Sequence, residues 1–104
     1  MIVKFGNDYL EKLFTGDFLK GKPKYSDSVI TKYKKVILIL KYVDSSIELS
    51  KFRGLNFEAL KGNKKGLYSV RVDSGYRLEF KLENDIIQLT EIAIIEELSN
   101  HYKK

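Results

Sequence analysis

The chain has 104 residues, 43% of them hydrophobic, which predicts one folded domain over residues 1–104 rather than a disordered chain. It has no cysteine and one histidine, which excludes disulfides, a cysteine nucleophile and a metal site built from thiolates or several histidines. Its longest unbroken apolar run, Val36 to Leu40, is too short to span a membrane, and its first residues do not form a signal peptide, so we expect a cytoplasmic protein.

The net charge of +5 is unevenly distributed along the chain. Residues 51–81 carry eight Lys and Arg against three acids, whereas residues 82–104 carry two Lys against five acids. A basic surface attracts nucleic acid through its phosphates. The alternative is that the lysines only keep a small protein in solution.

The first quarter of the chain predicts a strand and a short helix. Residues 1–5 are short of polar side chains and include the β-branched Ile2 and Val3, as in a strand. Asn7 is placed to cap a helix over residues 8–14, which Gly16 would end. Residues 16–25 hold two glycines and the only proline, so they predict a linker to the next helix.

A second, longer helix follows the linker. Ser26 or Ser28 is expected to cap it, and it should run to about Val43. Its apolar side chains follow helical spacing and predict the face turned to the core: Val29, Tyr33, Val36, Ile37, Leu40 and Val43.

A β-hairpin is predicted where the pattern changes to period two. Residues 67–72 and 76–82 each alternate apolar and polar side chains, as two strands with one buried face do. A three-residue turn between them pairs Val72 with Tyr76 and keeps every apolar side chain on one face, whereas a two-residue turn would mix the faces. Gly75 is expected to supply the left-handed residue of this turn.

The same register sets Arg71 directly opposite Arg77. Like charges facing each other across a sheet are destabilising, so folding gains little from this pair. Both side chains could turn into water, or Arg77 could pair with an acid such as Glu91. The other interpretation is that an anion with several oxygens, such as a phosphodiester, fits between the two guanidinium groups.

The end of the chain predicts one more strand and a tail. Residues 86–93 would form the strand, after a turn at Asn84 and Asp85, and residues 96–104 would form a short helical turn or tail. The order of elements predicts an α+β fold, with an N-terminal strand and two helices packed on a largely antiparallel β-sheet and a short C-terminal helical tail.

Four short motifs follow one another in the second half of the chain: Lys51-Phe52-Arg53-Gly54-Leu55, Leu60-Lys61-Gly62, Tyr68-Ser69-Val70-Arg71-Val72 and Tyr76-Arg77-Leu78-Glu79-Phe80. Together they resemble the core of the RelE superfamily of bacterial toxins, and most closely its HigB-type killer-protein branch. The helix over residues 29–43 and the following residues 45–49 also suit that branch.

The resemblance implies a RelE-like fold and the toxin of a type II toxin–antitoxin system. Members of this family are small cytoplasmic endoribonucleases that mostly cleave mRNA in the ribosomal A site, without metal or cofactor, and so inhibit translation. A co-expressed antitoxin neutralises them, and in the HigB branch it is a helix-turn-helix DNA-binding protein of the HigA type. The expected partners are therefore mRNA, the ribosome and such an antitoxin, with no membrane and no cofactor.

RNA cleavage by a neighbouring 2′-hydroxyl needs a base, an acid for the departing 5′-oxygen and cations on the phosphate. The resemblance implies Arg77 as the catalytic arginine, with Arg71 beside it. His101 and Tyr102 loosely match the catalytic Tyr and His that end the HigB branch. Glu58 stands where members often carry a second histidine, and would be a carboxylate base. The residues expected to contact RNA are Arg53, Lys61, Lys64, Lys65 and Tyr68.

Several alternatives remain open from the sequence. The chain could be a non-catalytic toxin of the same fold, similar to the ParE toxins that act on DNA gyrase. It could also be a plain RNA-binding module, because phosphate contacts serve binding as well as cleavage. The lysines of residues 61–65 could form an exposed charged turn, and His101 could belong to a frayed tail.

Overall fold

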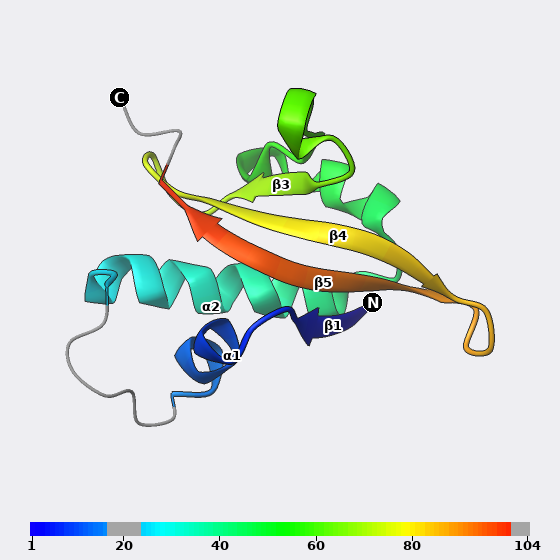
Figure 1. The fold of residues 1–104 in the computed structure, drawn as a ribbon, viewed down its shortest axis with the longest axis horizontal. Coiled ribbons are helices and arrows are strands. Elements are labelled where there is room, and N and C mark those ends of the chain that lie inside the picture. The colour runs from blue at the N-terminus through cyan, green and yellow to red at the C-terminus, as the bar shows by residue number, and fades with distance from the viewer. Residues whose placement is uncertain (17–23, 101–104) are drawn as a thin grey trace.

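One five-stranded sheet organises the molecule, in the order β1-β5-β4-β3-β2 (Figure 1). The computed structural model describes residues 1–16 and 24–100. β1 pairs in parallel with β5, and the other neighbouring strands are antiparallel. The strands are β1 (Ile2–Phe5), β2 (Glu58–Ala59), β3 (Tyr68–Arg71), β4 (Arg77–Asp85) and β5 (Thr90–Ser99). The helices are α1 (Asp8–Thr15), α2 (Asp27–Tyr42) and the 3-10 helices η1 (Ser46–Lys51), η2 (Arg53–Leu55) and η3 (Gly62–Lys64).

This arrangement confirms the α+β fold with an N-terminal strand and two helices against a largely antiparallel sheet. The predicted helix caps are also confirmed. The side chain of Asn7 accepts a hydrogen bond from the Leu10 amide, and Gly16 ends α1 in the left-handed conformation. Ser26 caps α2 by accepting from the Val29 amide. Most of the predicted linker, residues 17–23, lies outside the described residues.

The core lies between the sheet and the two helices, which pack on the same face of it (Figure 1). The predicted apolar stripe of α2 is buried there, and Tyr33, Ile37 and Leu40 have no exposed surface. Leu78 and Phe80 of β4 are equally buried opposite them. Within the described ranges, neither helix has the length and hydrophobicity that crossing a bilayer would require.

Tyr33 is a buried tyrosine whose hydroxyl donates to the carbonyl of Leu10, at 2.7 Å. Burial, and to a lesser degree the nearby Tyr25, raises the pKa of this hydroxyl well above its usual value. The neutral form is therefore favoured in the folded state. The buried neutral hydroxyl contributes its full stability below about pH 10, which is the pKa of tyrosine in the unfolded chain. This contribution is lost as the pH rises further, through the higher pKa of Tyr33 in the folded protein.

We therefore predict that Tyr33→Phe lowers the free energy of unfolding by about 1 kcal/mol at pH 7, the contribution of one hydrogen bond. The difference from the wild type should shrink above about pH 10, because only the wild type has to ionise a buried hydroxyl there. Urea unfolding of both proteins at neutral and at alkaline pH measures this. A difference that grows with pH would contradict the prediction.

The hairpin register is as predicted. β3 pairs with β4 so that Tyr68 faces Phe80, Val70 faces Leu78 and Arg71 faces Arg77. The expectation for Gly75 is wrong, because this glycine is not among the described residues with positive φ. The Asp73 carboxylate closes the turn instead, accepting from the amides of Gly75 at 2.9 Å and Tyr76 at 3.0 Å.

The predicted end of the sheet needs two corrections. β4 continues through Asn84 to Asp85, so the turn follows those residues instead of lying on them. The residues 86–89, read as the start of a strand because they are mostly apolar, form that turn. The Asp85 side chain holds it by accepting from the amides of Ile87 and Gln88, both at 3.0 Å.

The predicted helical tail is wrong for its first part, since β5 runs to Ser99. Ile95 and Leu98 are both buried although they are three residues apart, a spacing that looks helical in the sequence. The physical reason is a β-bulge. Glu79 of β4 faces Glu97, whereas the next residue, Phe80, faces Ile95, so β5 has one extra residue here. The rest of the tail, residues 101–104, lies outside the described residues.

Candidate active site

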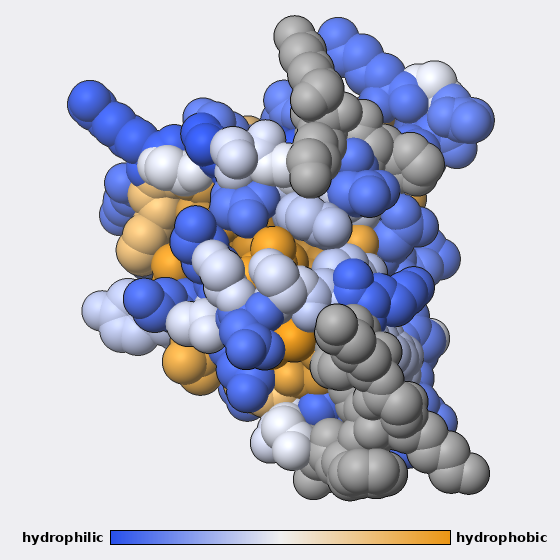
Figure 2. Space-filling model, turned by 90° about the vertical axis from the view of Figure 1, so that its left-hand side faces the viewer, coloured by the Kyte–Doolittle hydropathy of each residue, from blue (hydrophilic) through white to orange (hydrophobic). Residues whose placement is uncertain are grey.

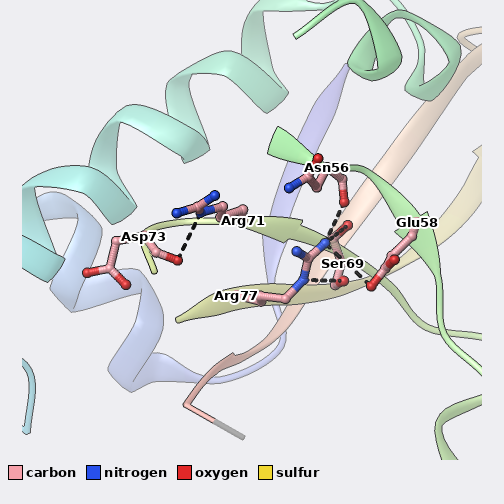
Figure 3. Close-up of polar contacts among 6 residues, drawn as sticks. All are labelled: Asn56, Glu58, Ser69, Arg71, Asp73 and Arg77. Carbon is pink, nitrogen blue, oxygen red and sulfur yellow. Dashed lines mark hydrogen bonds and ion pairs between the residues drawn. The ribbon is translucent and has the colours of Figure 1, made fainter. Parts of the chain in front are cut away.

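Arg77 occupies the start of β4, on the sheet face turned away from the helices. Its Nε donates to the Ser69 hydroxyl at 2.9 Å, and its Nη2 donates to the carbonyl oxygen of Asn56. Nη2 also lies 3.7 Å from a carboxylate oxygen of Glu58, on β2 (Figure 3). The Arg77 side chain is only 11% exposed, whereas that of Glu58 is 55% exposed. The fold therefore holds a guanidinium in a set position beside an accessible carboxylate.

Arg71 faces Arg77 in the register but turns the other way. Its Nε donates to the carbonyl oxygen of Asp73 at 3.3 Å, and the side chain is exposed. Figure 3 shows the two guanidinium groups pointing away from each other, each toward acceptors of its own. This divergence relieves the repulsion expected of the pair. An anion held between both arginines stays a prediction, and it would require Arg71 to change rotamer.

The interpretation that pairs Arg77 with Glu91 is wrong. Glu91 lies toward the opposite end of β5, where it faces Asn84. Its carboxylate accepts from the Ser46 amide at 2.6 Å and from the Ser46 hydroxyl at 2.9 Å. It therefore ties η1 to the sheet, at the end of β5 away from Arg77.

A buried ion pair lies next to Arg77 on the same face. Glu79 is 1% exposed, and both its carboxylate oxygens accept from Lys64 Nζ, at 3.0 and 2.8 Å. Lys64 sits at the end of η3, so this contact fastens the loop of residues 61–66 to the sheet. The contact favours a structural role for Lys64, beside the RNA contact predicted for it.

The remaining predicted residues lie in different environments. Arg53, at the start of η2, and Lys61 and Lys65, on either side of η3, are exposed. Tyr68 lies on the opposite, helix-facing side of the sheet, where it pairs with Phe80 and stacks on Phe57 with ring centroids 5.7 Å apart. Its ring therefore belongs to the aromatic cluster of the core, so the structure does not bring it together with Arg77. His101 and Tyr102 lie outside the described residues.

Sequence reasoning missed Ser69 and Asn56 as the groups that hold Arg77. Ser69 was placed on the correct face by the alternation of β3, which was the available signal. Asn56 gave none, because its contact is made by a main-chain carbonyl 21 residues away from Arg77. Its left-handed backbone, with φ of 44°, turns the chain at the end of η2.

A cleft of about 400 Å³ adjoins the end of β5 and was not expected from the sequence. Tyr25 and Tyr76 line it with rings 5.6 Å apart, together with Ser99 and Asn100. The Tyr25 hydroxyl donates to the Leu98 carbonyl at 2.9 Å, and burial raises the pKa of this hydroxyl. Figure 2, which views this end of the molecule, shows a mostly hydrophilic surface with apolar side chains exposed in places.

Comparison with solved structures shows that this fold is that of RelE- and YoeB-like toxins. A YoeB/ParE toxin from Agrobacterium tumefaciens is similar over 98% of this chain and 100% of that chain, with a TM-score of 0.58 and 19% sequence identity. At this identity the similarity establishes the fold alone. Comparison with curated proteins finds no match.

The chain belongs to the HigB-like toxin family, whose model, the RelE-like toxin of the type II toxin–antitoxin system HigB, matches residues 3–92. The resemblance seen in the sequence is thereby confirmed. The protein is a type II toxin, and toxins of this kind are translation-inhibiting endoribonucleases. Membership in such a system also implies an antitoxin as partner.

Proposed function

We propose that this toxin is itself an active endoribonuclease that cleaves mRNA in the cytoplasm, without a metal ion, while the mRNA is bound to the ribosome. The observation that carries the proposal is the position of Arg77. Its guanidinium is held by Ser69 and Asn56 and lies 3.7 Å from the accessible carboxylate of Glu58. A cation fixed before the substrate arrives can stabilise the charge that develops on a phosphate.

In the proposed reaction, Glu58 removes the proton from the 2′-hydroxyl, and the 2′-oxygen attacks the adjacent phosphorus. The bond from phosphorus to the 5′-oxygen breaks, and an acid returns a proton to that oxygen. The products are a 2′,3′-cyclic phosphate and a 5′-hydroxyl. Arg77 acts on the extra negative charge at phosphorus through the positive charge of its guanidinium, which is already held in position.

The acid is proposed to come from His101 or Tyr102. Ser99 faces Arg77 in the register of β4 and β5, and His101 follows two residues later. Arg53, Lys61 and Lys65 carry positive charge on the neighbouring segment and are proposed to bind the flanking phosphates.

The neutralising partner is proposed to be a helix-turn-helix antitoxin of the HigA type, encoded by the adjacent reading frame. A toxin that acts on DNA gyrase is the alternative within the same fold. An endoribonuclease and a gyrase-directed toxin can be distinguished by the molecule that they damage, since only the nuclease shortens mRNA.

We predict that induced expression without the antitoxin arrests growth and shortens translated mRNAs, and that the adjacent gene relieves the arrest. The new ends should be 2′,3′-cyclic phosphates, or the 2′- or 3′-phosphates into which these hydrolyse, facing 5′-hydroxyls. RNA ligation methods specific for each type of end measure this. Normal growth at a confirmed level of folded toxin, or 5′-phosphates facing free 3′-hydroxyls, would overturn the proposed mechanism.

A further inference from the structure

The turn between β4 and β5 exposes three large apolar side chains. Ile86 is 83% exposed, Ile87 is 93% exposed and Leu89 is 87% exposed. The turn projects from the fold at the end of the sheet opposite to the β3–β4 turn (Figure 1). Large apolar side chains gathered in water on one turn of a small protein mark a place where another molecule binds.

The backbone at Leu89 shows that folding alone does not account for this leucine. Leu89 has φ of 55°, the left-handed conformation, which a side chain with a β-carbon rarely adopts. Glycine or asparagine would suit this position better. A leucine kept in an unfavourable conformation, with its side chain in water, suggests a function for that side chain.

A hollow of about 380 Å³ lies beside these side chains. Ile86 and Leu89 line it, and three acidic residues surround them: Asp44, Asp85 and Glu91. These acids give the hollow a negative rim on a protein whose net charge is +5. The surface, which we call the tip surface, therefore consists of residues 84–91 together with Asp44 and Ser45.

The negative charge of the tip surface indicates which kind of molecule binds there. RNA would be repelled by the acidic rim. A second copy of this chain, docked through the same surface about a two-fold axis, would place acids against acids. The remaining occupant is a protein segment that offers apolar side chains to the hollow and Lys or Arg to the rim.

We propose that the tip surface is an anchoring site for the antitoxin, the protein partner that family membership implies. The anchored segment is an apolar one flanked by basic residues. β4 separates the tip from Arg77 by eight residue steps, roughly 26 Å at about 3.3 Å per residue. An antitoxin anchored there holds the toxin without covering Arg77, and another part of it has to block the site.

The test uses the double variant Ile87→Ser and Leu89→Gly, with Leu38→Ser as the matched control. Leu38 is also an exposed leucine, at 55%, but it lies on α2 and outside the tip surface. The probe is the purified product of the adjacent reading frame, immobilised for a binding measurement on the folded toxin. Thermal unfolding of the free toxin is recorded in parallel.

We expect the double variant to bind at least tenfold more weakly and the control to bind like the wild type. The melting temperature of the double variant should be unchanged or higher, because glycine relieves the positive φ of residue 89. In cells, the variant toxin should arrest growth even when the antitoxin is present. Higher salt should weaken the wild-type complex, because it screens the attraction between the acidic rim and a basic segment.

Binding of the double variant within twofold of the wild type would overturn the proposal. Equal weakening in the Leu38→Ser control would overturn the assignment to the tip. A wild-type dimer that the double variant dissociates, with antitoxin binding unchanged, would assign the surface to a second copy. These outcomes concern binding alone, so they remain separate from the failure of the nuclease proposal.

Discussion

Arg77→Ala should reduce single-turnover cleavage by about 100-fold or more, the effect of removing one preorganised group that stabilises developing charge. The proposed reaction has no other described cation held so closely beside Glu58. Arg77→Lys should recover little, because an ammonium cannot keep the contacts to Ser69 and Asn56 that position the guanidinium and also act on the phosphate. Cleavage of a synthetic mRNA in ribosome complexes, with toxin in excess, measures this.

The same substitution should also destabilise the fold, by about 1–3 kcal/mol, since it removes a donor from the buried Ser69 hydroxyl. The assay temperature must therefore lie below the melting transition of the variant, with the folded fraction checked by circular dichroism. Under that condition, loss of stability cannot account for loss of rate.

Arg71→Ala is the matched control, because this arginine faces Arg77 in the sheet but is exposed and donates to Asp73, just past the end of its own strand. We expect a smaller loss of rate than for Arg77→Ala and a change in stability of a few tenths of a kcal/mol. Full activity of folded Arg77→Ala would make Arg77 a structural residue. Equal rate losses in both variants would support a phosphate bound between the two arginines.

Lys64→Met should lower the free energy of unfolding by about 2 kcal/mol, between the values for exposed and for buried ion pairs. Methionine keeps most of the side-chain length but leaves the Glu79 carboxylate, 2% exposed, without the two contacts from Nζ. A buried carboxylate that loses its cation is costly because water cannot replace the contact. Urea unfolding of the purified variant measures the loss.

A double-mutant cycle separates the ion pair from other effects of Lys64. Adding Glu79→Gln to Lys64→Met should restore part of the lost stability, because the neutral amide no longer needs a cation. Lys65→Met, at an exposed neighbouring position, is the control and should change stability little. If Lys64→Met leaves stability unchanged but weakens RNA binding, Lys64 is a phosphate contact, as the sequence analysis predicted.

The sequence by itself determined the local elements of this protein. Asn7 and Ser26 cap helices through contacts within three residues, so the signal and the interaction lie in the same short segment. The register of β3 and β4 was equally predictable, because only one turn length keeps the apolar side chains on one face. Short motifs within residues 51–80 carried the resemblance to the toxin family, which the comparison confirmed.

Only the tertiary structure decided what surrounds Arg77 and how the sheet ends. Arg77 contacts Asn56 and Glu58, and both residues reach it only because the η2–β2 segment folds against the sheet. The bulge opposite Glu79 extends β5 to Ser99, where the sequence suggested a helical tail. The physical reason is the same in both cases. These contacts join residues far apart in the chain, so no local preference or periodicity records them, whereas helix caps are decided by neighbours.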